Sequence, residues 1–353
     1  MHAVGVHADN RKAVVFCEGE LGKRAGKIAN GLVRTSHYFD ICAVIDSHWH
    51  GLTADATVEG GQPIPVYGTL AEVMQAHKGI SWFIYGKLPS QEFIPDKERI
   101  YIRDALSRQL HVVSGLFHFL SDDEEFKSFA ADGLIFDLKK PPPLTEQPLF
   151  SGAVENVGAS RVLITGTDCD QGKHTTTYCL YQALKESGVS CAMVATSETG
   201  ILQGVSYGLC PDAWSLHSAA GGIEQLIIKC WEDQRPDIIL VEGLASASHP
   251  GLMTGMAVMK GCRPDAIIMQ DSPGRKARAS FPEFAKPDIR YEIALTRKLT
   301  NSEPIAITLT PEGMNLSEFS SFQEDLREEY DIPVVDPLQA GMGDLVDSVR
   351  QLL

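Results

Sequence analysis

Short hydrophobic runs rich in β-branched residues alternate with longer amphipathic stretches along the first half of the chain. We expect buried strands at residues 13–17, 41–45, 82–85, 111–113 and 134–136. Between them we expect helices at residues 70–77, 96–108 and 122–131, the last capped by Asp122 and Asp123. This alternation predicts a parallel sheet that is covered on both faces.

The same alternation continues in the second half. We expect strands at residues 161–165, 191–196, 238–241, 266–270, 305–309 and 334–335, and helices that begin near Lys173, Gly221, Ser317 and Gly343. The pattern predicts a second doubly wound, mostly parallel α/β domain.

A proline-rich segment separates the two halves. Three consecutive prolines at 141–143 follow two lysines, and such a run neither continues a helix nor occupies a central strand. A chain of 353 residues is also long for a single hydrophobic core. We therefore expect an N-terminal domain over residues 1–145 and a C-terminal domain over residues 146–353.

The net charge of the chain limits the classes of partner that it is expected to bind. It carries 31 basic and 46 acidic residues, which argues against nucleic acid because a phosphate backbone requires a basic face. No apolar run reaches the roughly 18 residues that span a bilayer, and the first residues lack the apolar core of a signal peptide. The eight cysteines contain no CxxC pair, which favours reduced thiols over a zinc site. We expect a cytoplasmic homo-oligomer that acts on a small molecule, away from membranes.

The loop after the first strand, residues 17–26, contains glycines, and Asp46 ends the second strand where a Rossmann site binds ribose. The glycine spacing is not GxGxxG, so we interpret the loop as an ordinary turn and leave a cofactor there open. His48 and His50 share no helix face, and we expect a solvated loop rather than a metal site.

The loop after the first strand of the second half carries the clearest chemical signal. An apolar run at 162–165 leads into GTDCDQGK at 166–173. Glycines let such a loop fold back so that backbone N–H groups at a helix N-terminus bind phosphate, and the lysine reaches the outer phosphates. The sequence therefore predicts a P-loop. Its expected ligand-binding residues are Gly166, Thr167, Asp168, Gly172, Lys173, His174, Thr175 and Thr176.

One position departs from the usual P-loop. Serine or threonine normally follows the lysine, and its hydroxyl ligates Mg²⁺, but His174 stands there. Thr175 comes one residue later and can bond an inner phosphate. The departure counts against metal binding and therefore against phosphoryl transfer.

An acidic residue closes a later strand. Glu242 follows the apolar run 238–241, a place where P-loop enzymes hold Mg²⁺ directly or through water. A carboxylate that only caps the strand end is the alternative. Asp212 is the second candidate metal ligand.

The GTDxxxGK pattern at 166–173 and the VEG sequence at 241–243 resemble dethiobiotin synthetase and its P-loop relatives, and Asp212 falls where that family carries a metal-binding aspartate. Residues 195–197 lack the Lys-Pro pair of that family, and residues 308–311 lack its adenine-contacting asparagine. The resemblance therefore implies the fold and not the reaction.

A set of short motifs extends over nearly the whole chain: VSGL at 113–116, KKPP at 139–142, GTD and GK within 166–173, TG at 199–200, DA at 212–213, VEG at 241–243, SHP at 248–250 and RPDA at 263–266. In this order they resemble a domain-of-unknown-function family with a Rossmann-like N-terminal domain and a P-loop NTPase-like C-terminal domain. Two positions depart from the expected pattern, Leu244 in place of glutamine and Phe117 in place of histidine. The family resembles DgcN-type D-glutamate N-acetyltransferases, which implies acetyl-CoA as the acetyl donor and D-glutamate as the acceptor. A P-loop can hold the phosphates of coenzyme A without cleaving them.

Under this resemblance, acetyl transfer requires a base for the substrate ammonium and cationic groups for its carboxylates. His249, in the loop beyond Glu242, is the candidate catalytic base, against the alternative of a loop histidine that packs on its own turn. Glu242 is the second candidate catalytic residue. Arg275 and Arg278 are the candidate substrate-binding residues, against the alternative of a solvated basic patch.

Two other classes of function stay open at this point. One is an ATP-dependent ligase or kinase of the dethiobiotin-synthetase type, which requires Mg²⁺ at Glu242 and Asp212. The other is a non-catalytic nucleotide sensor. Acetyl-CoA consumption, Mg²⁺-dependent release of ADP, and stabilisation by a ligand without turnover distinguish the three classes.

Overall fold

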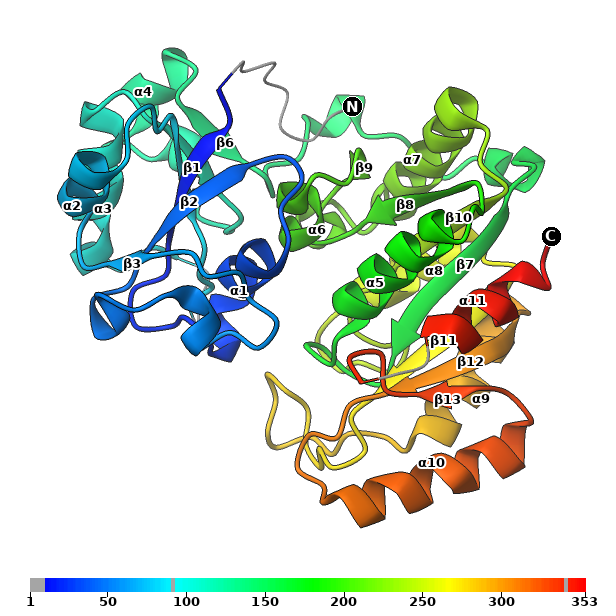
Figure 1. Ribbon diagram of the computed structural model, residues 1–353. Helices are drawn as coiled ribbons and strands as arrows, with labels where there is room; N and C mark the ends of the chain where they lie inside the picture. Colours follow the sequence, from blue (N-terminus) through cyan, green and yellow to red (C-terminus); the bar gives the residue numbers. More distant parts are fainter. Residues whose placement is uncertain (1–9, 90–92, 340–341) are drawn as a thin grey trace. The chain divides into compact units, whose positions relative to one another are not determined.

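The computed structural model describes residues 10–89, 93–339 and 342–353, and the chain divides into two compact units, each an α/β fold (Figure 1). The first unit comprises Met1–Pro141 and Glu198–Ala213, and the second comprises Pro142–Ser197 and Trp214–Leu353. Residues 198–213, which follow a strand of the second half in the sequence, thus belong to the first unit.

The first unit contains a sheet in the order β3-β2-β1-β4-β5-β6, and every pairing is parallel. This is the strand order of a Rossmann dinucleotide-binding sheet. The strands are β1 (Lys12–Phe16), β2 (Asp40–Ile45), β3 (Val66–Tyr67), β4 (Trp82–Tyr85), β5 (His111–Ser114) and β6 (Ile135–Asp137). The α-helices of the unit are α1 (Lys27–Arg34), α2 (Leu70–Ala76), α3 (Asp96–Ser107), α4 (Lys127–Ala131) and α6 (Glu198–Gln203), and the short strand β9 (Tyr207–Gly208) also belongs to it.

The central strands β1, β4 and β5 of the first unit are buried along most of their length because helices cover the sheet. All four residues of β4 are inaccessible to solvent, and Phe16 of β1 stacks on the rings of Phe83 and Tyr85. Continuous apolar runs, rather than alternation, are typical of parallel strands packed on both faces.

Within the second unit the sheet runs in the order β13-β12-β11-β7-β10-β8, and its pairings are parallel. The strands are β7 (Ser160–Gly166), β8 (Cys191–Ala195), β10 (Ile238–Glu242), β11 (Ala266–Asp271), β12 (Glu303–Leu309) and β13 (Val334–Val335). The chain proceeds from β7 to β8 on one side and from β10 to β11 on the other. The carboxyl end of β7 therefore lies at a topological switch point, where open α/β sheets bind ligands.

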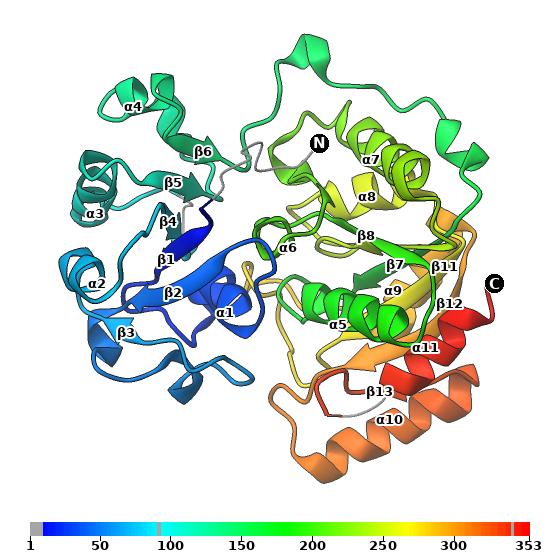
Figure 2. The ribbon, with the colours of Figure 1, turned by 45° about the horizontal axis from the view of Figure 1, so that its top comes forward.

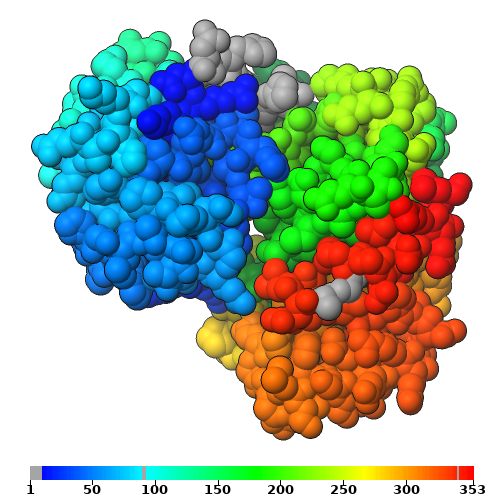
Figure 3. Space-filling model, viewed as in Figure 1, coloured from blue at the N-terminus to red at the C-terminus, as the bar shows by residue number. Residues whose placement is uncertain are grey.

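Helices cover both faces of the second sheet (Figure 2). They are α5 (Lys173–Glu186), α7 (Ala219–Gln234), α8 (Thr254–Cys262), α9 (Ile289–Thr300), α10 (Leu316–Tyr330) and α11 (Met342–Arg350). Helices α5 and α11 pack on alternate residues such as Val162 and Ile164, whereas α9 and α10 pack on Ile267 and Met269. In the space-filling view the end of the chain, in orange and red, forms a continuous surface on this unit (Figure 3).

The strands predicted from the sequence are present with shifts of at most two residues at their ends. The predicted helix 122–131 is wrong at its start, because α4 begins at Lys127 and has no side-chain cap. Asp123 pairs instead with Arg99, and with His118 at 2.8 Å. None of the described helices is long and apolar enough to cross a membrane.

Helix α8 (Thr254–Cys262) was not predicted from the sequence because it contains two glycines, which have low helix propensity. A Cβ at Gly261 would lie 2.4 Å from the carbonyl oxygen of Ala220 in α7. The glycine therefore permits the close approach of α7 and α8, a tertiary requirement that outweighs the local cost.

Candidate functional site

The P-loop lies at the carboxyl end of β7 and leads directly into α5. A Cβ at Gly166 would stand 2.6 Å from the carbonyl oxygen of Gln270, and Gly172 has a φ of 99°. Both positions therefore require glycine. Gly172 is also the N-cap of α5 and provides no capping side chain, so the N–H groups of the first helical turn are available to an anion.

The loop is held from its β11 side by polar contacts. Thr167 donates its backbone N–H to the carbonyl of Gln270 at 3.1 Å, and its hydroxyl bonds to Asp271. Asp271 in turn lies 2.7 Å from Lys286 Nζ. These contacts indicate a loop that is formed before a ligand arrives.

Lys173 folds back over the loop. Its Nζ donates to the carbonyl oxygen of Asp168 at 2.5 Å, and the residue is only 6% exposed. Burial lowers the pKa of Lys173, while the nearby acidic groups oppose that shift. The ammonium thus lies at the loop, where the P-loop prediction requires it.

Arg275 and Arg278 both contact the loop backbone. Arg275 donates to the carbonyls of Cys169 at 2.7 Å and Asp170 at 3.0 Å. Arg278 is 5% exposed and donates to the carbonyl of Thr167 at 2.6 Å. In this conformation the two guanidinium groups support the loop, and their predicted contact with substrate carboxylates stays a prediction.

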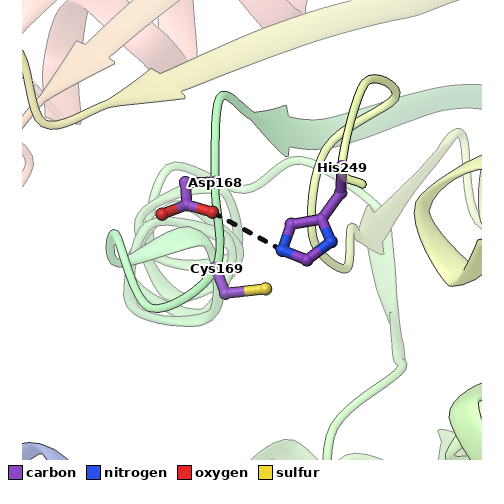
Figure 4. Close-up of side chains that lie close together, drawn as sticks. All are labelled: Asp168, Cys169 and His249. Atoms are coloured by element: carbon purple, nitrogen blue, oxygen red, sulfur yellow. Dashed lines mark ion pairs between the residues drawn. The ribbon is translucent and has the colours of Figure 1, made fainter. Parts of the chain in front are cut away.

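His249 points toward the loop from the segment after β10, and its Nε2 lies 3.8 Å from Asp168 Oδ1 (Figure 4). Its Nδ1 accepts the backbone N–H groups of Gly251 at 3.2 Å and Leu252 at 3.0 Å. A neutral ring with Nδ1 as acceptor carries its proton on Nε2. Burial lowers the pKa of His249, and Arg278 and Lys173 add to that shift against Asp168. The geometry thus favours a neutral imidazole that donates a hydrogen bond from Nε2.

This tautomer bears on the role predicted for His249. A catalytic base needs an unprotonated nitrogen that faces the substrate. Here the unprotonated nitrogen is engaged with the backbone, and the buried Nε2 has no hydrogen-bond partner among the described residues. A base role would require a different ring tautomer and the loss of both backbone hydrogen bonds.

Asp168, Cys169 and His249 are close enough in space to be compared with a metal site, since one ligand atom from each lies within 4.8 Å of the others (Figure 4). A histidine that ligates a metal through Nε2 normally donates its Nδ1 proton to an acceptor. The Nδ1 of His249 is itself the acceptor, and Arg275 lies 3.3 Å from Asp168 Oδ2. The protonation pattern and the positive charge both disfavour a cation here.

Glu242 ends β10 and is buried beside the first turn of α5. Its Oε1 lies 3.2 Å from His174 Nδ1, and its Oε2 accepts the backbone N–H of Thr196 at 3.1 Å. Burial is the largest influence on the Glu242 carboxyl and opposes its ionisation. His174 together with Ser197 and Thr196 outweighs burial, so the pKa of Glu242 is lowered.

Asp212 belongs to the first unit, whereas Glu242 belongs to the second. Asp212 Oδ2 lies 3.0 Å from Lys139 Nζ, and the same ammonium lies 2.7 Å from Glu198 Oε1. Burial raises the pKa of Asp212. A lysine thus lies beside the carboxylate that the sequence suggested for a metal ion.

The residues around the P-loop do not fit the Mg²⁺ ion that its fold family implies. Mg²⁺ prefers oxygen ligands, but the position of the usual hydroxyl carries the imidazole of His174. Both oxygens of Glu242 already have partners, and Asp212 is paired with Lys139.

Gln270, at the end of β11, is a residue of the site that the sequence did not reveal. Its Oε1 accepts hydrogen bonds from Thr176 at 2.7 Å and Thr308 at 2.6 Å. Its Nε2 is buried, has no hydrogen-bond partner among the described residues, and lies 3.9 Å from the place of a Cβ on Gly172. The available signal was a polar Gln-Asp-Ser sequence directly after the apolar run 266–269.

Comparison with known proteins supports the two-part organisation. Residues 148–346 match the model of the DUF1611_C P-loop domain, and residues 47–141 match that of the DUF1611_N Rossmann-like domain, both domains of unknown function. A solved structure of a DUF1611 family protein from Anabaena variabilis is 24% identical, with a TM-score of 0.88 over 97% of this chain and 100% of that chain. That structure bears on the fold alone.

Two curated relatives carry the name D-glutamate N-acetyltransferase. The protein from Pseudoalteromonas sp. is 27% identical over 77% of this chain and 82% of its own length. The protein from Tritonibacter scottomollicae is 28% identical over 69% of this chain and 74% of its own length.

Proposed function

Because this chain belongs to the DUF1611 family, we propose that it is an N-acetyltransferase that moves the acetyl group of acetyl-CoA to the amine of D-glutamate or a similar amino acid. The proposal is supported by the open N-terminus of α5 beside Lys173, which suits a phosphate ester. It is also supported by the name of the two relatives, which align with most of the chain.

In the proposed complex, the phosphates of the coenzyme lie on the P-loop. The first-turn N–H groups of α5, Lys173 Nζ and the Nε2 proton of His249 all carry positive character there. Gln270 Nε2 adds a buried donor on the β11 side. Donors of this kind hold phosphate oxygens without attacking the phosphorus.

The length of coenzyme A places its phosphates far from its reactive thioester. Between the pyrophosphate and the thioester, the pantetheine arm is roughly as long as four residues of extended chain, about 13 Å. His249 lies against Asp168 of the P-loop itself. We therefore propose that His249 contributes to coenzyme binding, and that the proton acceptor for the amine lies at the far end of the arm.

The reaction itself needs a neutral amine. A base removes one proton from the substrate ammonium, and the amine nitrogen then bonds to the thioester carbonyl carbon. The C–S bond breaks to release coenzyme A as a thiolate, and the nitrogen gives up its second proton, which the thiolate takes up, to leave the neutral amide. Hydrogen-bond donors near the carbonyl oxygen would stabilise the negative charge that develops on it.

The test is an assay of the purified protein with acetyl-CoA and D-glutamate, followed by thiol release and by mass spectrometry of the product. We expect N-acetylglutamate and an equal amount of coenzyme A, and L-glutamate in parallel reports the stereochemical preference. Release of ADP from ATP that depends on Mg²⁺, without acetyl transfer, would instead support the ligase or kinase class. Stabilisation by a nucleotide without turnover of any substrate would support a sensor.

A further inference from the structure

We propose that the imidazole of His174 takes the place of the Mg²⁺ ion at this P-loop, so that the loop binds phosphate esters without a divalent cation. The inference rests on the proposed phosphate-binding role of the loop. It concerns what neutralises the ligand, which the proposed acetyl transfer does not specify.

The proposal is based on the contacts of the Glu242 carboxylate. In a P-loop enzyme, the hydroxyl after the lysine and the acid on the neighbouring strand are both directed at the metal. Here the residue after Lys173 is His174, and its Nδ1 lies 3.2 Å from Oε1 of that acid. The imidazole thus directly contacts the carboxylate that would otherwise bind the ion.

The second carboxylate oxygen is also engaged. Glu242 Oε2 accepts the Thr196 backbone N–H at 3.1 Å, and the Glu242 side chain is only 2% exposed. Movement of Glu242 toward a cation would break both contacts and leave a backbone N–H unpaired in the interior. The site therefore holds the carboxylate away from metal coordination.

Fixed cations supply the charge that Mg²⁺ provides elsewhere. Lys173 and Arg278 reach loop carbonyls at 2.5 Å and 2.6 Å. Arg275, which is also paired with Glu312 at 2.6 Å, reaches another at 2.7 Å. These groups need no bound ion to offset the charge of a pyrophosphate. They do not replace Mg²⁺ in cleavage of a nucleotide, because the metal bridges the β and γ phosphates in phosphoryl transfer. A loop of this kind suits an intact phosphate ester such as coenzyme A.

The experiment compares binding of ADP and of coenzyme A to the full chain by calorimetry, in EDTA and in excess Mg²⁺. We expect the wild-type affinity to change by less than about three-fold, because no charge-assisted contact to a metal is gained or lost. In His174→Thr, which restores the usual hydroxyl and releases Glu242, we expect Mg²⁺ to strengthen ADP binding by at least roughly 10-fold. His217→Thr, on the exposed surface of the same unit, is the matched control and should behave as wild type.

A direct metal readout accompanies the calorimetry. Electron paramagnetic resonance of Mn²⁺ compares ADP alone with ADP plus protein. We expect wild type to bind no Mn²⁺ beyond that held by ADP itself, and His174→Thr to bind additional Mn²⁺.

The outcomes separate the two proposals. Wild-type binding that is lost in EDTA, or additional Mn²⁺ bound by wild type, overturns the inference and leaves phosphate binding by the loop intact. A His174→Thr variant that stays independent of metal shows that His174 does not exclude the ion, which also overturns it. Absence of ADP and coenzyme A binding under both conditions overturns the proposed function together with the inference.

Discussion

Each unit of this protein has a glycine-containing loop between a central strand and the helix that follows, yet only one of the two is suited to an anion. In the first unit the loop joins β1 to α1, and in the second it joins β7 to α5. Both sheets are parallel, and both loops leave the carboxyl end of a strand that has neighbours on each side.

The first loop is closed by the side chains of the protein itself. Leu21 donates its N–H to Asp46 at 3.2 Å, and Gly22 donates its N–H to Asn30 at 2.9 Å. Asp46, the residue that could bind ribose in a Rossmann site, is fully buried and accepts the N–H of His48 as well. Its carboxylate is therefore occupied within the loop.

The second loop is supported from outside while its helix terminus stays open. Arg275 and Arg278 bind loop carbonyls, and Gly172 leaves α5 without a side-chain cap. The comparison teaches that topology alone does not make a phosphate site. What decides is whether protein side chains or a ligand satisfy the N–H groups of the loop.

The largest expected effect concerns the buried lysine beside the first loop. Lys87 lies 3.0 Å from Glu98 Oε1 and donates to the carbonyl of Glu18 at 2.7 Å. Lys87→Ala leaves the buried carboxylate of Glu98 without its cationic partner, with the Tyr85 hydroxyl still bonded at 2.6 Å, and should lower the free energy of unfolding by about 3–5 kcal/mol. Denaturant titration, with tryptophan fluorescence as the probe of unfolding, measures this change in free energy.

The control for this change is Lys97→Ala, since Lys97 is exposed on α3. If Lys87→Ala lowers the free energy of unfolding by less than about 1 kcal/mol, the ion pair contributes no more than one on the surface. That result would show that Lys87 does not stabilise the first loop.

The second effect concerns the corresponding lysine of the P-loop. Lys173→Ala should weaken coenzyme A binding by about 10- to 150-fold, which corresponds to roughly 1.5–3 kcal/mol for a charged hydrogen bond. The fold should persist, because the ammonium bonds to a loop carbonyl and supports no hydrophobic cluster. Calorimetry of coenzyme A measures the change, and Lys185→Ala on the exposed end of α5 is the matched control. Equal affinity of variant and wild type would remove the P-loop assignment.

The third prediction concerns the N-terminal capping of helix α2 in the first unit. Thr69 caps α2 by accepting the N–H of Glu72, whose side chain returns to the backbone of Thr69. Thr69→Ala should cost about 0.5–2 kcal/mol of stability and leave coenzyme A affinity unchanged. Thr69→Ser keeps the capping oxygen and should behave as wild type in the same thermal denaturation. If both variants lose the same amount of stability, the effect comes from removal of the Thr69 methyl group and not from loss of the capping oxygen.

The fourth effect separates two roles for His249. As a hydrogen-bond donor to phosphate, its removal in His249→Ala should raise the dissociation constant of coenzyme A by about 2- to 12-fold, or roughly 0.5–1.5 kcal/mol. As a catalytic base, its removal should lower kcat by roughly 10²–10⁴-fold with little effect on binding. Steady-state kinetics combined with calorimetry measures both quantities, and a fall in kcat alone would restore the base assignment.

The smallest effect is a pH dependence of stability. The pKa of His249 is lower in the folded protein than its ordinary value of about 6.5. Between these two values the unfolded chain binds more protons, so stability should fall as the pH decreases below about 6.5. His249→Gln should lose that part of the dependence, whereas His217→Gln on the exposed surface should keep it. Identical pH profiles for His249→Gln and wild type would contradict the buried neutral ring.

Central strands such as β4 and β10 could be predicted closely because their apolar runs are contiguous and buried on both faces. The start of α4 was misplaced because Asp123, a good capping residue, forms an ion pair with Arg99 of another helix. Of the candidate site, Gly166, Gly172 and Lys173 were recognisable because spacing within one short segment defines them. Gln270 was not, since its one local signal, a polar sequence after an apolar run, is shared by many strand ends.

The sequence by itself determined that the chain has two parallel α/β units and that one of them carries a P-loop, because apolar periodicity and loop spacing are local properties. The tertiary structure alone decided the partners of the charged side chains. It paired Glu242 with His174, turned Arg278 onto the loop and joined Asp212 to Lys139. Hydrogen-bond and ion-pair partners depend on distances of a few ångströms between residues far apart in the chain, and no pattern along the sequence encodes such distances directly.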